Sequence, residues 1–124
     1  MEKGKLNLIE GMYEYVLDNS LRESDVLNRL RLETEKDSSA IMQIPAEQGQ
    51  FMALLVKLIG AKRTIEIGVY TGYSTLCVSQ AMPSDSYTVA CDVSEEWTNV
   101  AKRYWKEADV DKKSTLGLHQ RQKP

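Results

Sequence analysis

The segment from Thr64 to Ser74, TIEIGVYTGYS, constrains the fold of this 124-residue chain more than any other. A short apolar stretch leads into two glycines and then into a helix-compatible stretch, which is typical of a buried strand that turns into a helix. Gly68 and Gly72 would let the backbone approach a bound molecule where a Cβ would collide. Glu66 places a carboxylate at the strand end facing the same crevice. We call residues 68–72 the glycine turn, and the pattern predicts that it binds a cofactor.

The spacing of these residues narrows the class of ligand. Glu-x-Gly-x-x-x-Gly differs from the Gly-x-Gly-x-x-Gly of dinucleotide-binding proteins, and no lysine follows the second glycine, which excludes a P-loop. A second predicted strand, Tyr87 to Asp92, ends in an acid 24 positions after Gly68. In nucleotide-binding strand–helix–strand units, a carboxylate about 20 residues beyond the glycines binds ribose hydroxyls. The pattern therefore favours an adenosine-containing ligand.

Three segments carry a resemblance to a known family. Residues 42–51 (MQIPAEQGQF), 66–74 (EIGVYTGYS) and 90–97 (ACDVSEEW) resemble the cation-dependent O-methyltransferases, which include caffeoyl-CoA O-methyltransferase and its bacterial relatives. The segment SEEW at residues 94–97 resembles the bacterial-type branch more than the plant lignin enzymes. The resemblance covers about residues 5–113. It implies an α/β chain, the N-terminal part of a Rossmann-like S-adenosylmethionine-dependent methyltransferase fold, with a helical N-terminus followed by strand, helix, strand and helix.

The same resemblance implies roles for individual residues. Asp92 would hold the ribose of S-adenosylmethionine, and Ile44 matches a cofactor-contacting position where a threonine or valine is common. The family's acceptor is a hydroxyl of a small molecule similar to catechol or caffeoyl-CoA. Neither Glu66 nor Asp92 is expected to transfer a proton, so we assign no catalytic residue. The residues expected to line the cofactor pocket are Ile44, Glu66, Gly68, Val69 and Ser74.

The chain departs from the family pattern after Lys113. Residues 114–124, STLGLHQRQKP, show no strand pattern, whereas the resemblance implies further strands. We therefore expect residues 1–113 to be the N-terminal portion of a methyltransferase domain, residues 114–124 to be a divergent tail, and the sheet to be incomplete. Relatives take a divalent cation from residues after their fourth and fifth strands. We accordingly expect no metal site and no activity from the chain alone, because the metal lowers the pKa of the attacking hydroxyl.

Composition bounds the remaining classes of function. Charged residues make up 27% of the chain and the net charge is −2, which favours neither nucleic acid nor membrane as a partner. No apolar run reaches the roughly 18 residues of a membrane span, and the N-terminus lacks the apolar core of a signal peptide. We expect a cytoplasmic protein. Cys77 and Cys91 lack metal-ligand spacing, so they are expected to be buried free thiols.

Periodicity predicts five helices and two strands. The first helix carries an apolar stripe around Ile9 to Leu17, and Ser20 with Glu23 reads as a capping box that opens the second. A third helix repeats the apolar spacing from Phe51 to Ile59, and the fourth and fifth run over 74–82 and 95–108, the latter capped by Ser94. Trp97 is assigned to the inner stripe of the fifth helix. Residues 64–67 read as a central strand covered on both faces, with one edge left unpaired.

Two other functions stay open at this point. The chain could be a non-catalytic interaction or regulatory subunit, either as a homo-oligomer or paired with an intact methyltransferase through its N-terminal helices. It could also be a nicotinamide-dependent oxidoreductase, although the glycine spacing makes this the weaker alternative. Co-purification with a full-length homologue would favour the first, and binding of NAD would favour the second.

Overall fold

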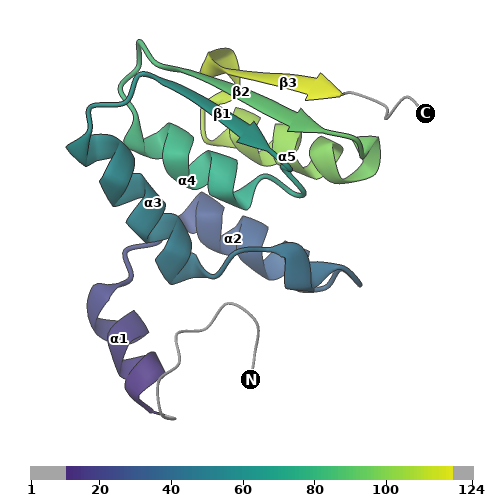
Figure 1. The fold of residues 1–124 in the computed structure, drawn as a ribbon. Helices are drawn as coiled ribbons and strands as arrows, with labels where there is room; N and C mark the ends of the chain where they lie inside the picture. The colour runs from purple at the N-terminus through teal and green to yellow at the C-terminus, as the bar shows by residue number, and fades with distance from the viewer. Residues whose placement is uncertain (1–10, 119–124) are drawn as a thin grey trace.

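A computed structural model describes residues 11–118 as one layer of sheet and a set of helices (Figure 1). No helix in this range is long and apolar enough to cross a membrane. The elements follow the predicted order of helices, strand, helix, strand and helix, with one more strand after them. They are α1 (Met12–Ser20), α2 (Asp25–Thr34), η1 (Ala40–Met42), α3 (Ala46–Leu58), β1 (Arg63–Ile67), α4 (Tyr73–Ala81), β2 (Tyr87–Asp92), α5 (Glu95–Glu107), η2 (Asp111–Lys113) and β3 (Ser114–Leu118).

The sheet has three parallel strands in the order β1-β2-β3. The first strand forms as predicted, with one edge unpaired, since it pairs only with β2 among the described residues. The expectation that residues 114–124 contain no strand was wrong, because residues 114–118 form β3. Its own sequence carries little strand signal, since Gly117 interrupts the apolar positions. Pairing with β2 from Thr88–Ser114 to Asp92–Leu118 creates the strand.

All the helices lie on one side of the sheet (Figure 1). The core between them includes Leu30 of α2, Leu76 of α4, and Ala101 and Trp105 of α5. The expectation that the first strand is covered on both faces was therefore wrong for the described residues. Ile65 and Ile67 stay 69% and 83% exposed on the face opposite the helices.

The third helix does not bury the apolar stripe that its sequence shows. It packs against α4 through small residues, because a Cβ on Gly49 would lie only 2.6 Å from Cys77 Sγ. Ala46 and Gly49 are its buried residues. Its apolar stripe, by contrast, is between 41% and 76% exposed. We call this stripe, Phe51, Leu54, Leu55, Leu58 and Ile59, the α3 stripe.

The helix caps confirm one prediction and correct another. Ser94 caps α5 as expected, accepting a hydrogen bond from the amide of Trp97 at 3.3 Å. The second helix is capped by Ser24, whose hydroxyl accepts from the amide of Leu27 at 3.3 Å, and not by Ser20, which ends α1. The capping-box pattern misled because two serines lie four positions apart and only the second precedes the helical backbone.

Candidate cofactor site

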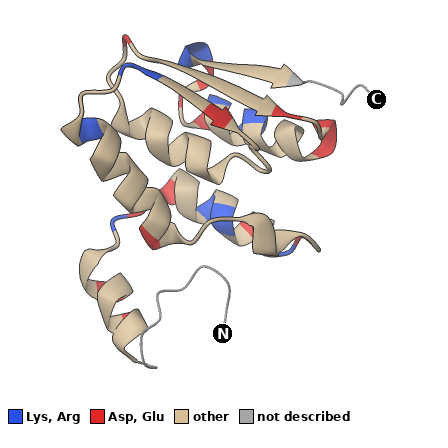
Figure 2. Ribbon diagram, viewed as in Figure 1, with Lys and Arg blue, Asp and Glu red and all other residues tan. Residues whose placement is uncertain are grey.

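Five of the six residues expected to contact the cofactor line one hollow. It has a volume of about 120 Å³ and lies where β1 ends and α4 begins. Figure 2 shows acidic residues at the carboxyl ends of both β1 and β2, the edge at which parallel α/β sheets bind ligands. The predicted residues in its lining are Ile44, Glu66, Gly68, Val69 and Ser74. The sixth residue, Asp92, does not line the hollow but is hydrogen-bonded to it.

The carboxylate of Asp92 joins the end of β2 to the glycine turn. Its Oδ2 accepts hydrogen bonds from the amides of Val69 at 2.7 Å and Tyr70 at 2.8 Å. Its Oδ1 accepts from the amides of Val93 at 2.6 Å and Ser94 at 3.0 Å. Burial alone would raise the pKa of Asp92, but the hydrogen bonds from the four backbone amides together hold this pKa below its usual value. A ribose hydroxyl would therefore have to share these oxygens with backbone amides.

Glu66 is held by α4 rather than by a cation. Its two oxygens accept hydrogen bonds from the hydroxyls of Ser74 and Thr75, at the first turn of that helix. Burial raises the pKa of Glu66 above its ordinary value, and the two hydroxyl bonds offset part of that rise. The two hydroxyl bonds therefore fix the strand end against α4 and place the Glu66 carboxyl beside the hollow.

The two glycines of the turn serve different purposes. Gly68 has φ 89° and lines the hollow, and a Cβ there would meet no atom within 4 Å. Gly72 has φ 88°, but a Cβ there would lie 2.6 Å from Ala101 Cβ and 2.7 Å from Trp105 Nε1. The expectation that both glycines make room for a ligand was thus wrong for Gly72, which makes room for α5 instead.

Tyr70 adopts a backbone conformation that is uncommon for a residue with a side chain, with φ 55°. Its hydroxyl donates to Asp37 Oδ1 at 2.9 Å, and its ring meets Trp97 edge to face with centroids 4.9 Å apart. Trp97 is half-buried and lies outside the core, so its assignment to the inner stripe of α5 was wrong. The glycine turn is therefore held by three contacts, from Asp37 ahead of η1, from Asp92 of β2 and from Trp97 of α5.

Sequence reasoning missed Gln43, which also lines the hollow. Its Oε1 is buried and accepts no hydrogen bond from the described residues. Its Nε2 donates to the carbonyl of Arg31 at 3.3 Å. The available signal was its place beside Ile44 in a segment that carries the family resemblance. A buried acceptor without a partner, together with the free space at Gly68, fits a ligand that brings a hydrogen-bond donor.

The described residues do not fit a divalent cation. Among residues 11–118, no group of three or more His, Cys, Asp or Glu side chains lies close enough to hold one. Glu107, one of the acids beyond Asp92, instead pairs with Arg29.

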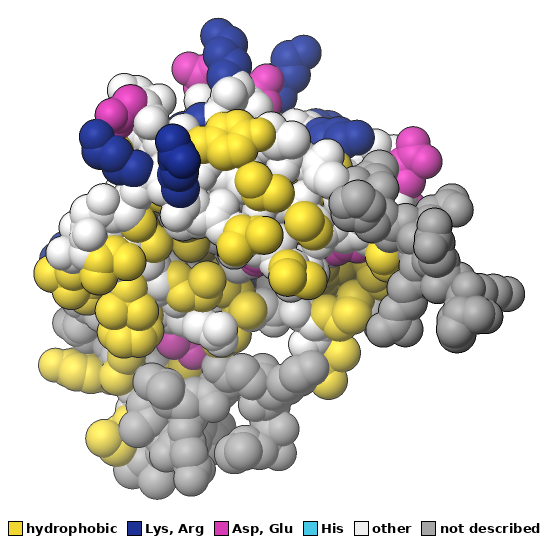
Figure 3. Space-filling model, turned by 45° about the horizontal axis from the view of Figure 1, so that its top comes forward, with side chains coloured by type: hydrophobic (Ala, Val, Ile, Leu, Met, Phe, Trp, Pro, Cys, Tyr) yellow, Lys and Arg dark blue, Asp and Glu magenta, His cyan; other side chains and the backbone are white. Residues whose placement is uncertain are grey.

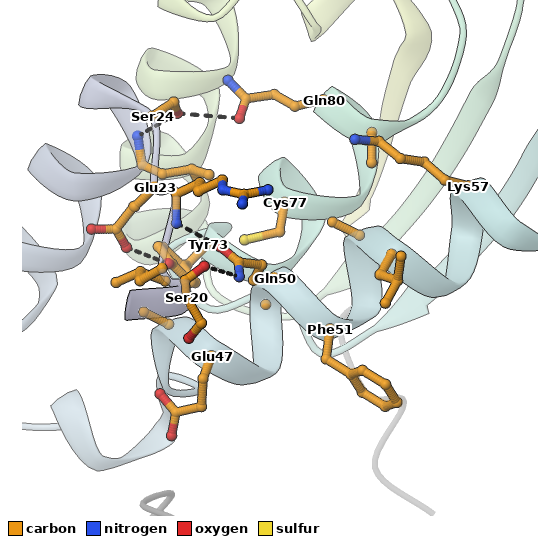
Figure 4. A pocket seen from close by; sticks show the side chains of 18 residues that line it. Ser20, Glu23, Ser24, Glu47, Gln50, Phe51, Lys57, Tyr73, Cys77 and Gln80 are labelled. Atoms are coloured by element: carbon orange, nitrogen blue, oxygen red, sulfur yellow. Dashed lines mark hydrogen bonds between the residues drawn. The ribbon is translucent and has the colours of Figure 1, made fainter. Parts of the chain in front are cut away.

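A larger hollow of about 530 Å³ lies between α2, α3 and α4, and none of the six predicted residues lines it (Figure 4). Polar groups in it bond to one another: Ser24 Oγ donates to Gln80 Oε1 at 3.3 Å, and Gln50 Nε2 donates to the carbonyl of Ser20 at 2.6 Å. Burial raises the pKa of the Cys77 thiol to about 12, so this thiol is unreactive near neutral pH. One polar atom of a lining residue stays unpaired, since Glu47 Oε1 is buried without a hydrogen-bond partner among the described residues.

Comparison with known proteins identifies a family for the sequence. The pattern of the O-methyltransferase family matches residues 17–123. Caffeoyl-CoA O-methyltransferase of Medicago sativa is 40% identical over 116 residues, which cover 90% of this chain and 47% of that protein. Caffeoyl-CoA O-methyltransferase 1 of Zea mays is 43% identical over 99 residues, which cover 77% of this chain and 38% of that protein. The chain thus spans less than half the length of these relatives.

Solved structures agree on the fold. The O-methyltransferase TomG of Streptomyces achromogenes, solved in complex with S-adenosylmethionine, superposes with a TM-score of 0.80 at 23% identity. The match covers 86% of this chain and 48% of TomG. It confirms the predicted α/β fold, the N-terminal portion of a Rossmann-like methyltransferase architecture.

Proposed function

Because this chain belongs to the O-methyltransferase family, we propose that it binds S-adenosylmethionine beside the glycine turn and that the site serves methyl transfer to a hydroxyl group. The acceptor we propose is a small hydroxylated molecule similar to catechol or caffeoyl-CoA, since relatives with 40% and 43% identity include caffeoyl-CoA O-methyltransferases. The chain spans less than half of those relatives, so this activity is proposed for the site and not for the isolated chain.

One observation carries the proposal. Residues from two segments far apart in the sequence, within 42–44 and 66–74, meet at a single hollow at the carboxyl end of β1. The carboxylate that the family resemblance assigns to the ribose is bonded directly to the backbone of this hollow at Val69. A group of residues chosen from sequence alone therefore forms one contiguous surface, in the place where α/β proteins bind nucleotides.

The chemistry that this chain can contribute is positioning. When bound, S-adenosylmethionine supplies an electrophilic methyl group for in-line displacement by a deprotonated hydroxyl. The hydrogen bonds that Asp92 accepts from backbone amides fix the glycine turn. Those that Glu66 accepts from the hydroxyls of Ser74 and Thr75 fix the end of β1 against α4. Holding the reacting groups in line is itself a large part of catalysis in such reactions.

We propose that the 124-residue chain does not turn over by itself. Both oxygens of Glu66 and both oxygens of Asp92 already accept hydrogen bonds, so neither is placed to take the proton of an acceptor hydroxyl. The described residues offer no cluster for a cation that would acidify the hydroxyl. A catechol methylation assay with added Mg²⁺ should therefore give no product, and clear product would contradict this proposal.

Calorimetric titration with S-adenosylhomocysteine tests whether the cofactor binds. Wild-type chain should bind saturably, and Gly68→Ala should lose binding because the new Cβ enters the hollow. Gly60→Ala is a matched control, because Gly60 also has positive φ, at 63°, and a Cβ there also meets no atom within 4 Å. Equal loss of binding in both variants would show that backbone strain, and not occupation of the hollow, is responsible.

The exposed α3 stripe favours a second proposal, in which the chain is a non-catalytic partner of an intact methyltransferase. Contiguous exposed apolar surface is typical of protein interfaces. The stripe lies on α3, one of the helices that precede the sheet, and pairing with an intact methyltransferase is expected through these N-terminal helices. Co-purification of the chain with a full-length homologue would support this proposal, and a monodisperse monomer in the presence of that homologue would count against it.

A further inference from the structure

Gln43, a lining residue of the cofactor hollow, carries a buried acceptor without a partner among the described residues. Three side-chain oxygens among the described residues are buried without a hydrogen-bond partner: Gln43 Oε1, Glu47 Oε1 and Ser114 Oγ. Of these residues only Gln43 lines the hollow beside the glycine turn. Buried acceptors are nearly always paired in folded proteins, because water has been removed from them. The Gln43 oxygen is therefore expected to meet a donor that a ligand supplies.

The orientation of the Gln43 amide follows from its other contact. Nε2 donates to the carbonyl of Arg31 at 3.3 Å, and exchanging the amide nitrogen and oxygen would place two acceptors against each other. Arg31 is itself held at the end of α2 by Glu23 at 2.9 Å and Glu35 at 3.0 Å. The anchor of the amide is thus part of the packed helical layer, and the free oxygen is fixed in place before any ligand binds.

The remaining polar groups of the hollow favour a cationic donor. Its lining contains the carboxylate of Glu66 and the hydroxyl of Ser74, and it contains no Lys, Arg or His. A positively charged N–H donor would gain both a hydrogen bond to Gln43 and attraction from Glu66.

The size and position of the hollow then indicate which end of the cofactor it can enclose. A volume of about 120 Å³ is below the roughly 300 to 1,000 Å³ of a whole ligand pocket, so it can enclose only part of S-adenosylmethionine. At the border of the hollow, its lining residue Tyr70 contacts Trp97 at the start of α5, next to Asp92, and a flat base would find an apolar surface there. The ammonium of the amino-acid end is the cationic donor that remains for the hollow.

We infer that Gln43 Oε1 accepts a hydrogen bond from the ammonium group of the cofactor's amino-acid end. Gln43 would thereby select S-adenosylmethionine and S-adenosylhomocysteine over adenine nucleosides that lack this group. The inference rests on the proposed function, because it assumes that the hollow binds this cofactor.

Calorimetric titration of the full chain with two ligands tests the inference. S-adenosylhomocysteine carries the ammonium group, whereas 5′-methylthioadenosine keeps the base and ribose but lacks the amino-acid end. Gln43→Met removes the acceptor at similar side-chain length and should weaken binding of S-adenosylhomocysteine by about ten- to a hundredfold. Its affinity for 5′-methylthioadenosine should equal that of the wild type. Gln48→Met, at an exposed position on α3 outside the hollow, is the control.

The outcomes separate failure of this inference from failure of the proposed function. A wild-type chain that binds neither ligand overturns the proposed function and this inference with it. If the wild type binds S-adenosylhomocysteine but Gln43→Met binds both ligands as the wild type does, the inference is overturned and the proposed function stands. Equal weakening of both ligands also overturns it, because Gln43 would then support the hollow as a whole. Circular dichroism of each variant confirms that the comparison is made on folded protein.

Discussion

The two faces of the sheet contrast sharply in what they carry. On the face toward the helices, side chains are polar or small and paired: the hydroxyls of Thr64 and Thr88 lie 2.9 Å apart, and Ala90 is fully buried. On the opposite face, β1 carries Ile65 and Ile67 in solvent, and Figure 3 shows hydrophobic side chains gathered over this side. The covered face is thus the more polar one. The contrast teaches that the apolar residues of β1 do not stabilise the layer of helices that the structure describes.

The largest expected effect tests this contrast directly. Leu76 of α4 is fully buried, so Leu76→Ala should lower the free energy of unfolding by about 2 to 5 kcal/mol. Ile67→Ala, on the uncovered face, should change it by less than about 0.5 kcal/mol. Urea denaturation measures both values. Comparable losses would mean that the face of Ile67 is packed in solution, and the contrast would fail.

The glycine turn offers a second and smaller comparison. Gly68→Ala and Gly72→Ala both place a side chain at a positive φ near 90°, which costs about 1 to 2 kcal/mol. Gly72→Ala should cost about 1 to 3 kcal/mol more, because its Cβ meets Ala101 and Trp105 while that of Gly68 meets open space. Thermal unfolding of the two variants measures the difference. A larger loss for Gly68→Ala would show that the hollow is closed in solution.

The pH dependence of stability tests the Asp92 contacts. The folded-state pKa of Asp92 lies below its usual value, so its contribution is present above the unfolded pKa of about 3.9 and is lost as pH falls through the folded value. Asp92→Asn should reduce the free energy of unfolding by about 1 kcal/mol at pH 7. The difference from the wild type should shrink below about pH 4. A constant difference down to pH 2 would contradict the assigned contacts.

The smallest effect on folding should come from the uncovered face, where the readout is association. The double variant Ile65→Lys, Ile67→Lys places charge at two exposed positions and should change stability by less than about 0.5 kcal/mol. It should also reduce concentration-dependent self-association, because charge on an exposed edge strand opposes pairing with another chain. Sedimentation velocity over a range of concentrations measures this. Unchanged association would locate the associating surface elsewhere, with the α3 stripe as the next position to substitute.

Short-range sequence patterns were sufficient to predict the strands and the turn around the site. Glu66, Gly68 and Asp92 could be placed from sequence because strand, turn and strand each leave a short-range signal, and the structure brings Gly68 and Asp92 to one turn. The third strand could not be predicted, because Gly117 breaks its pattern and only its pairing with β2 defines it. Gln43 was missed and Trp97 was misplaced for a similar reason. What distinguishes them is a missing partner and a ring contact between elements, and neither is visible in periodicity.

The family was predictable for the same reason. The O-methyltransferase match over residues 17–123 confirms the resemblance drawn from three short motifs. The bacterial-type branch that the segment at residues 94–97 favours stays a prediction, and plant enzymes match this chain at 40% and 43% identity. These four residues open α5, where Ser94 caps the helix, so helix capping constrains part of the segment in any branch.

The bond between Asp92 and the amide of Val69 also has a consequence for the order of folding. It connects positions 23 residues apart, across the whole of α4, and no local contact can replace it. The turn therefore reaches its final conformation only when β2 has docked in parallel beside β1, a non-local step that is slow in folding. The nascent strand and helix should thus form before the chain can recognise a ligand, and recognition should arise in the same step that completes the β1–β2 pair.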